Sequence, residues 1–590
     1  MSFHPNDMAR RARGATAALA IVFGIFLSAF FRTQVLHNSQ YALRSEENRL
    51  SEVPIPAPRA VIYDRKGLII AENVPGYSVS ILSPSEDSLR ASLARLSRLV
   101  QLDSSSIESA ARRFQRAQNR PTVVFSDASF DLISVLEEHR VDFPDLIIQS
   151  APKRVYPDGP AVAAFVGYTA EITEQELAKP EFDAYKAGQQ VGKAGLERQY
   201  EALLRGQEGK RFVEVDARGR VVREAGAREE LAPRQPPPLY TNIDLELQRF
   251  VASMFGDSIQ GGLIALEPRT GEVLAMHSAP SYDPNRFIGV IPQSYWNELM
   301  TDPRRPLYNK VLQGRYAPAS TFKLATAAIG LENGVVTLDS HMPVPCTGGY
   351  LYGNRYFRCW NRQGHGDLPL SRAIAVSCNV YFYQLGLKLG LARLLAGGVQ
   401  MGFGERSGID LPNEIRSTFP DAVEYYNQRY GPRGWSSAVI LNLAIGQGEN
   451  QQTVANVARF YSALATDGHA ATPHMVRGNP DRVQILRLSE RQAAGLRAAM
   501  SEVVSARGTA GSAAIEGVVL AGKTGTAQNS ADRSRDHAWF AGFAPAEDPK
   551  IVIAVMIEFG EHGYTAARMA SRAVSFYLKA ATAELANTDG

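Results

Sequence analysis

The hydrophobic pattern near the N-terminus predicts one membrane-spanning helix. Residues 14–31 form an uncharged run of 18 residues, and at about 1.5 Å per helical residue this run covers about 27 Å, enough to cross the hydrocarbon core of a bilayer. Arg10, Arg11 and Arg13 precede the run, so the positive-inside rule keeps the N-terminus in the cytoplasm and exports the rest. A cleaved signal peptide would need a small-x-small site beyond residue 31, and none is present. We therefore expect a cytoplasmic tail at residues 1–13 and an uncleaved anchor at residues 14–36.

The residues that follow mix strand and helix patterns and predict a first exported domain at residues 37–240. Residues 61–67 have the pattern of a strand that enters a turn, and residues 212–222 have that of a hairpin. Leucines recur every three or four positions between residues 85 and 100, which predicts a helix. Residues 224–238 are first charged and then rich in proline, so we interpret them as a linker.

The remaining residues predict a second domain at 241–582, followed by a short tail at 583–590. The domain begins with a helix and two strands and ends with two strands and a helix, at residues 245–255, 262–266, 272–276, 537–544, 551–559 and 564–581. Because strands from both ends of the region enclose its helices, we expect a body of the α+β class.

Composition and charge exclude several classes of protein. Hydrophobic residues make up 45% of the chain and charged residues 21%, which is ordinary for a globular protein and excludes a disordered, collagen-like or coiled-coil chain. The mean hydropathy is slightly negative, so the chain is not a multi-span membrane protein. The net charge of +3 in 590 residues gives no indication of a nucleic-acid partner.

The motif Ser-x-x-Lys occurs twice, and only the second copy suits catalysis. Pro152 lies inside the first copy, Ser150 to Lys153, and would break a helix there. The second copy, Ser320 to Lys323, opens a good helical pattern, and i, i+3 spacing brings its hydroxyl and amine side by side. A desolvated, neutral lysine can take the proton of a serine hydroxyl, and helix N-terminal amides can stabilise an oxyanion. On its own the motif is weak evidence, because an N-cap serine beside a solvated lysine is the commoner cause of such a pattern.

Two further motifs occur once each downstream of Ser320. Ser377-Cys378-Asn379 offers a hydroxyl that can relay a proton and an amide that can hold the substrate. Lys523-Thr524-Gly525, followed by Thr526, offers a cation and two hydroxyls to a carboxylate, beside a glycine that lets a substrate backbone approach. These three motifs in this order define the serine acyltransferases that react with penicillin.

With these motifs the chain resembles the class B penicillin-binding proteins, the D,D-transpeptidases of peptidoglycan synthesis. The likeness runs from the anchor to the last helix, and the segments that look like those of the family, besides the three motifs, are residues 63–67, 191–197, 269–276, 408–412 and 445–448. It implies an elongated pedestal of the dimerisation type at residues 37–240, then a transpeptidase domain with a central antiparallel sheet, similar to serine β-lactamases. The elongation-specific subfamily, penicillin-binding protein 2, looks closest, and the division-specific subfamily is the alternative.

The resemblance also implies the reaction. Ser320 would be acylated by a stem peptide ending in D-Ala-D-Ala as the terminal D-Ala leaves, and an amine from a neighbouring strand would resolve the ester. Two positions depart from the family pattern: Ala319 stands where many members have glycine, and Val454 stands where proline is usual. Since neither residue carries a reacting group, we interpret both as packing variation.

All three cysteines fall within one stretch, together with a histidine. Cys346, Cys359, His365 and Cys378 give the complete ligand set of a structural zinc site, whereas a disulfide would leave one thiol exposed to oxidation. Cys378 should point away from its neighbours Ser377 and Asn379, so a metal would anchor this loop from behind. Elongation-type members of the family have a similar four-ligand zinc site. A disulfide with one free thiol, or three unligated core thiols, remain the alternatives.

The family likeness implies a place and partners as well. We expect a single-pass protein of the bacterial inner membrane with a periplasmic catalytic domain. Its partners would be peptidoglycan stem peptides on nascent glycan strands, β-lactam antibiotics, a membrane glycosyltransferase of the shape, elongation, division and sporulation type, and other proteins of the elongation complex.

Three other functions would use some of the same residues. A serine β-lactamase commonly has Glu-x-x-Leu-Asn for fast deacylation, and the nearest match, Glu424 to Asn427, lacks its spacing. A D,D-carboxypeptidase remains possible because water can replace the acceptor amine. A purely non-catalytic scaffold is disfavoured by the intact Ser320, Lys323 and Lys523.

Overall fold

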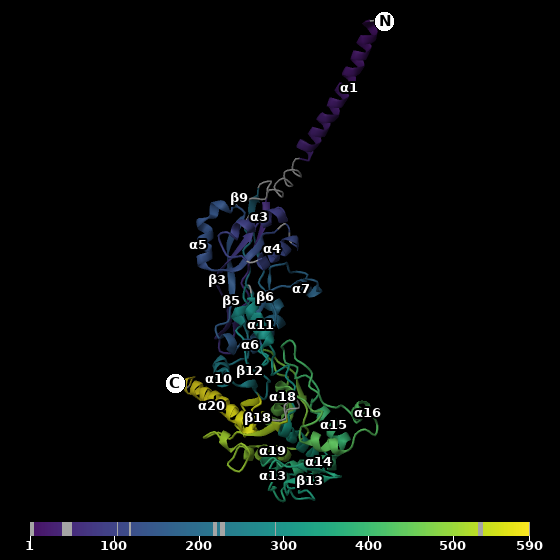
Figure 1. The fold of residues 1–590 in the computed structure, drawn as a ribbon, viewed down its shortest axis with the longest axis vertical. Coiled ribbons are helices and arrows are strands. Elements are labelled where there is room, and N and C mark those ends of the chain that lie inside the picture. The colour runs from purple at the N-terminus through teal and green to yellow at the C-terminus, as the bar shows by residue number, and fades with distance from the viewer. Residues whose placement is uncertain are drawn as a thin grey trace.

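The computed structural model describes residues 5–37, 50–102, 104–116, 118, 120–215, 221–224, 230–289, 291–528 and 535–588. The molecule is elongated, with the N-terminal helix at one end and the larger, C-terminal domain at the other (Figure 1). Helix α1 (Pro5–Phe31) continues into a π-helical turn, η1 (Arg32–Leu36). Within the described residues, Met8–Leu36 is the one helix long and apolar enough to cross a membrane, and no part of its apolar window is buried in the protein. It contains the anchor predicted at residues 14–36.

The pedestal contains two main sheets. Three antiparallel strands run in the order β1 (Leu50–Ile55), β8 (Gly209–Val215), β9 (Val221–Glu224), so the predicted hairpin at residues 212–222 is present, with its tip outside the described residues. A five-stranded sheet runs β10 (Leu239–Tyr240), β2 (Ile62–Tyr63), β3 (Ile69–Ile81), β4 (Thr122–Ala128), with β5 (Leu146–Val155) also paired to β3. Strand β5 contains Ser150 and Lys153, which confirms that the first Ser-x-x-Lys is not helical.

Three helices cover the strands of the pedestal: α3 (Glu86–Leu96), α4 (Ser104–Arg116) and α5 (Phe130–Glu138). Helix α3 is the one that the leucine spacing predicts. Ser85 caps it by accepting a hydrogen bond from the backbone of Ser88, and Leu89, Leu93 and Leu96 are buried on one face.

We call residues 159–206 the neck, since they join the pedestal strands to the second domain. Its elements are short: α6 (Ala163–Val166), β6 (Thr169–Glu171), α7 (Glu174–Leu177), β7 (Gln190–Gly192), α8 (Gly195–Gln199) and α9 (Glu201–Leu204). The fully buried carboxylate of Glu197 accepts hydrogen bonds from Arg59 at 3.0 Å and from Arg154 at 2.7 Å. This ion-pair cluster ties the neck to the segment before β2 and to β5.

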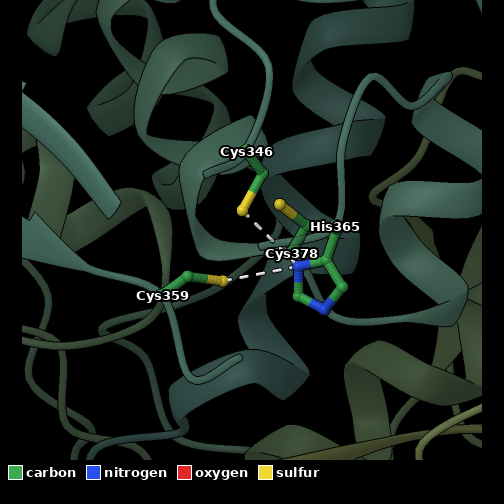
Figure 2. Close-up of side chains that lie close together, drawn as sticks. All are labelled: Cys346, Cys359, His365 and Cys378. Carbon is green, nitrogen blue, oxygen red and sulfur yellow. Dashed lines mark hydrogen bonds between the residues drawn. The ribbon is translucent and has the colours of Figure 1, made fainter. Parts of the chain in front are cut away.

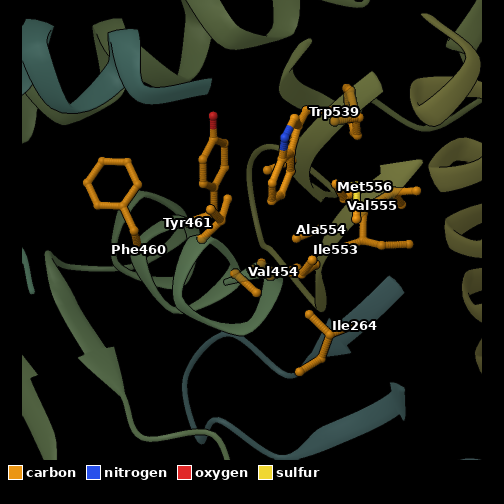
Figure 3. Close-up of a cluster of buried hydrophobic side chains, with 14 of the residues drawn as sticks. Ile264, Val454, Phe460, Tyr461, Trp539, Ile553, Ala554, Val555 and Met556 are labelled. Atoms are coloured by element: carbon orange, nitrogen blue, oxygen red, sulfur yellow. The ribbon is translucent and has the colours of Figure 1, made fainter. Parts of the chain in front are cut away.

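The second domain has one central antiparallel sheet assembled from both ends of its sequence. The strand order is β12 (Val273–Ala279), β11 (Gln260–Leu266), β19 (Ile551–Glu558), β18 (His537–Ala544), β17 (Ala521–Ala527). Helices α10 (Leu245–Phe255) and α20 (Gly563–Thr588) pack on the sheet and on each other, and α18 (Val454–Ala465) packs on β11, β18 and β19. Figure 3 shows the apolar side chains of α18 beside those of β11, β18 and β19. The α+β prediction is therefore confirmed.

The remaining elements of this domain lie between β12 and β17 in the sequence. They are α11 (Gln293–Thr301), α12 (Lys323–Glu332), β13 (Gly349–Tyr352), β14 (Arg355–Arg358), α13 (Leu370–Ala375), α14 (Asn379–Leu389), α15 (Leu391–Gln400), α16 (Glu424–Tyr430), α17 (Ala438–Ala444), β15 (His469–Ala471), β16 (Arg482–Gln484) and α19 (Glu490–Val503). The first two sequence motifs also lie in this stretch, at the starts of α12 and α14, whereas the third lies on the edge strand β17.

Candidate active site and thiol cluster

Ser320 lies in a single 3₁₀ turn, Ala319–Phe322, that leads directly into α12. The turn is held from outside, because the backbone N–H of Ala319 donates to the carbonyl of Gly446 at 2.9 Å. Ala319 has φ of +48°, a left-handed conformation that costs a residue with a Cβ about 1–2 kcal/mol. The glycine usual at this position in the family therefore relieves backbone strain, so our interpretation of Ala319 as packing variation is wrong.

The amine of Lys323 is fully buried and bound by the second motif. Its Nζ donates to Oδ1 of Asn379 at 2.7 Å, to the carbonyl oxygen of Ser377 at 2.9 Å and to the Ser377 hydroxyl at 3.2 Å. The Ser320 hydroxyl makes no side-chain hydrogen bond to any described residue, so its expected pairing with the amine is not formed in this state. Burial lowers the pKa of Lys323 to about 8.

The second motif divides its side chains between two sites. Ser377 has φ of +56° and Cys378 is the N-cap residue of α14. This sharp backbone turn lets Ser377 and Asn379 both contact Lys323, while the Cys378 thiol joins the other cysteines. Asn379 is also tied to the β14 strand, since its Nδ2 donates to the carbonyl of Arg358 at 3.4 Å.

The third motif lies on β17, at the edge of the central sheet. Lys523 is fully buried, and its Nζ donates to the carbonyl of Thr524 at 3.2 Å. Burial, followed by repulsion from Lys323, lowers the pKa of Lys523 well below its usual range. The Thr524 hydroxyl lies 2.7 Å from that of Thr509, and Thr526 is exposed.

Gly525 lies against the turn Ala319–Phe322, which carries Ser320 and which we call the nucleophile turn. A Cβ at this position would lie 3.1 Å from the carbonyl oxygen of Pro318 and 3.3 Å from the Thr321 methyl group. We expected this glycine to make room for a substrate backbone, and the structure shows that it makes room for the protein's own turn.

The four predicted metal ligands lie together behind the second motif. Their ligand atoms all lie within 4.8 Å of one another, and the three thiols are buried and free of disulfides. Nδ1 of His365 lies 3.6 Å from Sγ of Cys346 and 3.6 Å from Sγ of Cys359. Figure 2 shows the four side chains converging on one point.

The donor set and spacing fit zinc. Zn–S bonds of about 2.3 Å and Zn–N bonds of about 2.0–2.1 Å in a tetrahedron place nitrogen and sulfur about 3.6 Å apart. This is the separation found between His365 and each of the two nearest thiols. The hydrogen bond between the thiols of Cys378 and Cys359 lowers the pKa of Cys359 and raises that of Cys378, so the two thiols are close enough to share one proton.

Three residues of the site were not found from the sequence. Arg358 holds Asn379, Gly446 holds the turn that carries Ser320, and Thr509 contacts Thr524. Arg358 acts through its backbone carbonyl, which no pattern of side chains reports. Gly446 had a signal, because residues 445–448 resemble a family segment, but its role was not assigned. A Cβ on Gly446 would lie 2.2 Å from the carbonyl oxygen of Ala319.

Comparison with known proteins agrees with this arrangement. Residues 261–575 match the penicillin binding protein transpeptidase domain, and residues 54–233 match the penicillin-binding protein dimerisation domain. The peptidoglycan D,D-transpeptidase MrdA of Acinetobacter baumannii is 31% identical over 96% of this chain and 87% of its own length. The chain belongs to the MrdA (PBP2) family of penicillin-binding proteins.

Other PBP2 proteins match over a similar extent. MrdA of Escherichia coli K12 is 30% identical over 94% of this chain and 92% of its own. The solved complex of PBP2 and MreC from Helicobacter pylori has a TM-score of 0.79 at 28% identity, over 90% of this chain and 99% of that one. Pseudomonas aeruginosa PBP2, solved in complex with WCK 5153, has a TM-score of 0.67 at 32% identity, over 89% and 96%. The predicted family, its elongation-type subfamily and the predicted pedestal-plus-transpeptidase fold are confirmed.

Proposed function

We propose that the chain cross-links peptidoglycan during cell elongation through an acyl-enzyme at Ser320. The observation that best supports this proposal is the buried amine of Lys323. It lies one helical turn after Ser320 and is bound by Ser377 and Asn379. Membership of the PBP2 family supplies the reaction, a penicillin-sensitive D,D-transpeptidation with release of terminal D-Ala.

The first step needs a base that removes the proton of the Ser320 hydroxyl, and we assign this role to Lys323. With a pKa of about 8, about one amine in ten is neutral at pH 7, against about one in three thousand for an ordinary lysine. The neutral amine takes the proton of Ser320 as its oxygen attacks the penultimate D-Ala carbonyl. Hydrogen bonds to Asn379 and Ser377 hold the amine in place, and no carboxylate among the described residues pairs with it. The three nearby thiols oppose the fall in its pKa, but burial has the larger effect.

The leaving group and the substrate carboxylate need two further residues. The Ser377 hydroxyl lies 3.2 Å from the Lys323 amine, so it can pass a proton from that amine to the departing D-Ala nitrogen. Lys523 and the hydroxyls beside it receive the terminal carboxylate, whose negative charge favours the protonated form of the buried amine. An acceptor amine then resolves the ester and frees Ser320.

The test is covalent labelling by a fluorescent penicillin. Ser320→Ala should lose labelling completely. Ser150→Ala, in the other Ser-x-x-Lys, should label like the wild type because β5 holds that serine in the pedestal. Persistent labelling of Ser320→Ala would falsify the assignment.

We also propose that Cys346, Cys359, His365 and Cys378 hold one structural zinc ion. Buried thiols and a histidine at tetrahedral spacing support this, and three thiolates with one imidazole leave no position open for substrate. When bound, the metal would supply a cross-link between the loops that carry these residues. The metal would affect catalysis only indirectly. It would fix the backbone at Cys378, and so the neighbouring side chains of Ser377 and Asn379 that hold Lys323. Metal analysis of the purified protein tests this, with close to one equivalent expected.

The membrane topology and partners are part of the same proposal. The apolar helix Met8–Leu36 and the arginines before residue 14 support a single-pass inner-membrane anchor with the catalytic domain in the periplasm. The solved complex of H. pylori PBP2 with MreC supports the proposal that this chain also binds a protein of the elongation complex. A membrane glycosyltransferase would supply nascent strands. Co-purification from detergent should recover the glycosyltransferase with the full chain and lose it when residues 1–235 are removed.

A further inference from the structure

The hairpin of β13 and β14 has an outer side that the site described above does not use. Its two strands pair antiparallel, with Leu351 opposite Tyr356, and they pack on α14 (Figure 1). Side chains alternate between the two sides of a strand. Phe357 is buried and meets the ring of Tyr383 on α14 edge to face, so its neighbours Tyr356 and Arg358 lie on the outer side of the hairpin.

The exposed surface of this segment is rich in large apolar side chains. Leu351 is 65% exposed, Tyr356 53% and Trp360, just after β14, 57%. Tyr356 rests against Gly349, since a Cβ on that glycine would lie 2.3 Å from the tyrosine ring. Exposed apolar groups that lie together typically mark a binding surface, and aromatic side chains lose little entropy when they bind. We call Leu351, Tyr356, Arg358 and Trp360 the hairpin surface.

The charge of the segment has a single sign. Residues 341–366 contain three arginines, Arg355, Arg358 and Arg362, and no Asp or Glu. All three arginines are exposed, and none of them forms an ion pair with a carboxylate in the part of the chain that the structure describes. A guanidinium group binds a carboxylate through two parallel hydrogen bonds. The segment therefore favours a ligand that combines an anionic group with apolar surface.

Two hydrogen bonds join the hairpin surface to the second motif. The indole Nε1 of Trp360 donates to the carbonyl of Val376, the residue before Ser377, at 3.0 Å. The carbonyl of Arg358 accepts from Nδ2 of Asn379 at 3.4 Å. Since Ser377 and Asn379 both hold the catalytic amine, the hairpin surface is continuous with the wall of the active site.

Transpeptidation brings two stem peptides to one serine, and the residues assigned so far serve only the first. Lys323 activates Ser320, and Lys523 receives the carboxylate of the peptide that acylates it. The second peptide, which we call the acceptor, must place its amine at the ester on Ser320. Since an unblocked peptide chain ends in a carboxylate, the acceptor also brings a negative charge, which complements the charge of this segment.

We propose that the hairpin surface binds the acceptor peptide. The acceptor's carboxylate pairs with Arg358, and its backbone and alkyl groups pack on Tyr356 and Trp360. In the step that follows, the neutral acceptor amine forms a bond to the acyl carbon, the ester bond to Ser320 breaks, and one proton of the amine ends on the serine oxygen. This inference rests on the proposed function, because it concerns the second half of that reaction.

The experiment measures the two halves of the reaction separately. The full chain in detergent is given a donor pentapeptide ending in D-Ala-D-Ala and a tripeptide acceptor with a free side-chain amine, and mass spectrometry quantifies transfer and hydrolysis. Arg358→Gln should lower the ratio of transfer to hydrolysis by at least about tenfold, and Tyr356→Ala by at least about threefold. Arg393→Gln, which changes an exposed arginine of α15, should leave the ratio unchanged.

Penicillin acylation of the same variants shows whether the catalytic residues are intact. Its rate should stay within about twofold of the wild type in all three, because the hairpin surface acts only after the acyl-enzyme has formed. A fall in acylation as large as the fall in transfer would overturn the proposal. Absence of penicillin acylation in the wild type would instead contradict the proposed function.

A modified acceptor tests the charge contact directly. With its terminal carboxylate converted to an amide, the tripeptide should be used at least about tenfold less efficiently by the wild type. Arg358→Gln should use the two acceptors about equally, since the charge that distinguishes them is gone. Equal use of both acceptors by the wild type, an unchanged ratio in Arg358→Gln, or hydrolysis without any transfer overturns the proposal.

Discussion

The Tyr200 hydroxyl donates a hydrogen bond of 2.5 Å to Oδ2 of Asp410 and so joins the neck to the transpeptidase domain. The same carboxylate accepts hydrogen bonds from the backbone N–H groups of Met475 and Val476, at 2.5 and 3.1 Å. Burial, followed by the bond to this carboxylate, raises the pKa of Tyr200. Asp410 lies within residues 408–412, a segment whose family likeness had no assigned role, and its role is to fasten the two domains.

Tyr200→Phe should therefore loosen the domains without touching the chemistry. Loss of a hydrogen bond to a charged group lowers the free energy of unfolding by about 1.5–3 kcal/mol. Denaturant titration of the full chain measures this, and Tyr564→Phe, an exposed tyrosine of α20, serves as the control. The rate of penicillin acylation should stay within twofold of the wild type. A large drop in that rate with unchanged stability would contradict a purely structural role.

The pKa of Lys323 predicts how acylation depends on pH. Only the neutral amine can accept a proton, so below a pKa of about 8 the acylation rate should fall by roughly tenfold per pH unit. Stopped-flow measurement of penicillin acylation between pH 6 and 9 gives the profile. Lys323→Arg keeps the charge but stays protonated, so its rate should fall by more than about a hundredfold. A profile that is flat across this range would exclude Lys323 as the base.

Gly446→Ala should disturb the nucleophile turn from outside. The new Cβ would lie 2.2 Å from the Ala319 carbonyl oxygen and 2.7 Å from the Phe322 Cβ, so the turn that carries Ser320 must move. Acylation should fall by at least about tenfold, since small displacements of a nucleophile are costly.

Gly448→Ala is the matched control for this change. Gly448 has φ of +75°, similar to +73° at Gly446, but its Cβ would meet nothing closer than 3.7 Å. It should lose about 1 kcal/mol of stability from backbone strain and retain acylation. If both variants acylated alike, steric contact with the turn would not be the cause.

The zinc proposal predicts that one histidine far from the substrate controls acylation. His365→Ala and Cys378→Ser should each reduce bound zinc, thermal stability and penicillin acylation together. His341→Ala removes an exposed histidine bonded to Asp367 at 2.8 Å and should change none of the three. Chelator treatment of the wild type should expose the thiols to reagents. Full activity after complete loss of metal would contradict the proposal, and a mass two hydrogens below the reduced value would favour a disulfide.

The sequence predicted the architecture well where local pattern and tertiary contacts agree. Helix α10 and strand β18 begin and end at the predicted residues, and β19 is one residue shorter than expected. Each of these elements is strongly apolar and bounded by a capping residue or a turn, so its ends are determined by nearby residues. The four candidate metal ligands, which the sequence groups within 33 residues, also lie close together in space.

What the sequence could not provide depends on contacts between distant residues. The spacing of Ser320 and Lys323 predicted a direct contact, but the amine binds Ser377 and Asn379, more than fifty residues away. The φ of Ala319 follows from its hydrogen bond to Gly446, which no local propensity contains.

The tripeptide at 377–379 joins the catalytic lysine to the thiol cluster. Its outer residues hold Lys323, and its middle residue is one of three clustered thiols. If the proposed zinc ion is bound there, an oxidant that attacks these sulfurs, or loss of the metal, would slow cross-linking without competing with the substrate. Oxidation of the thiols and acylation by β-lactams would then act on the same active site, and oxidised protein should be acylated more slowly at Ser320.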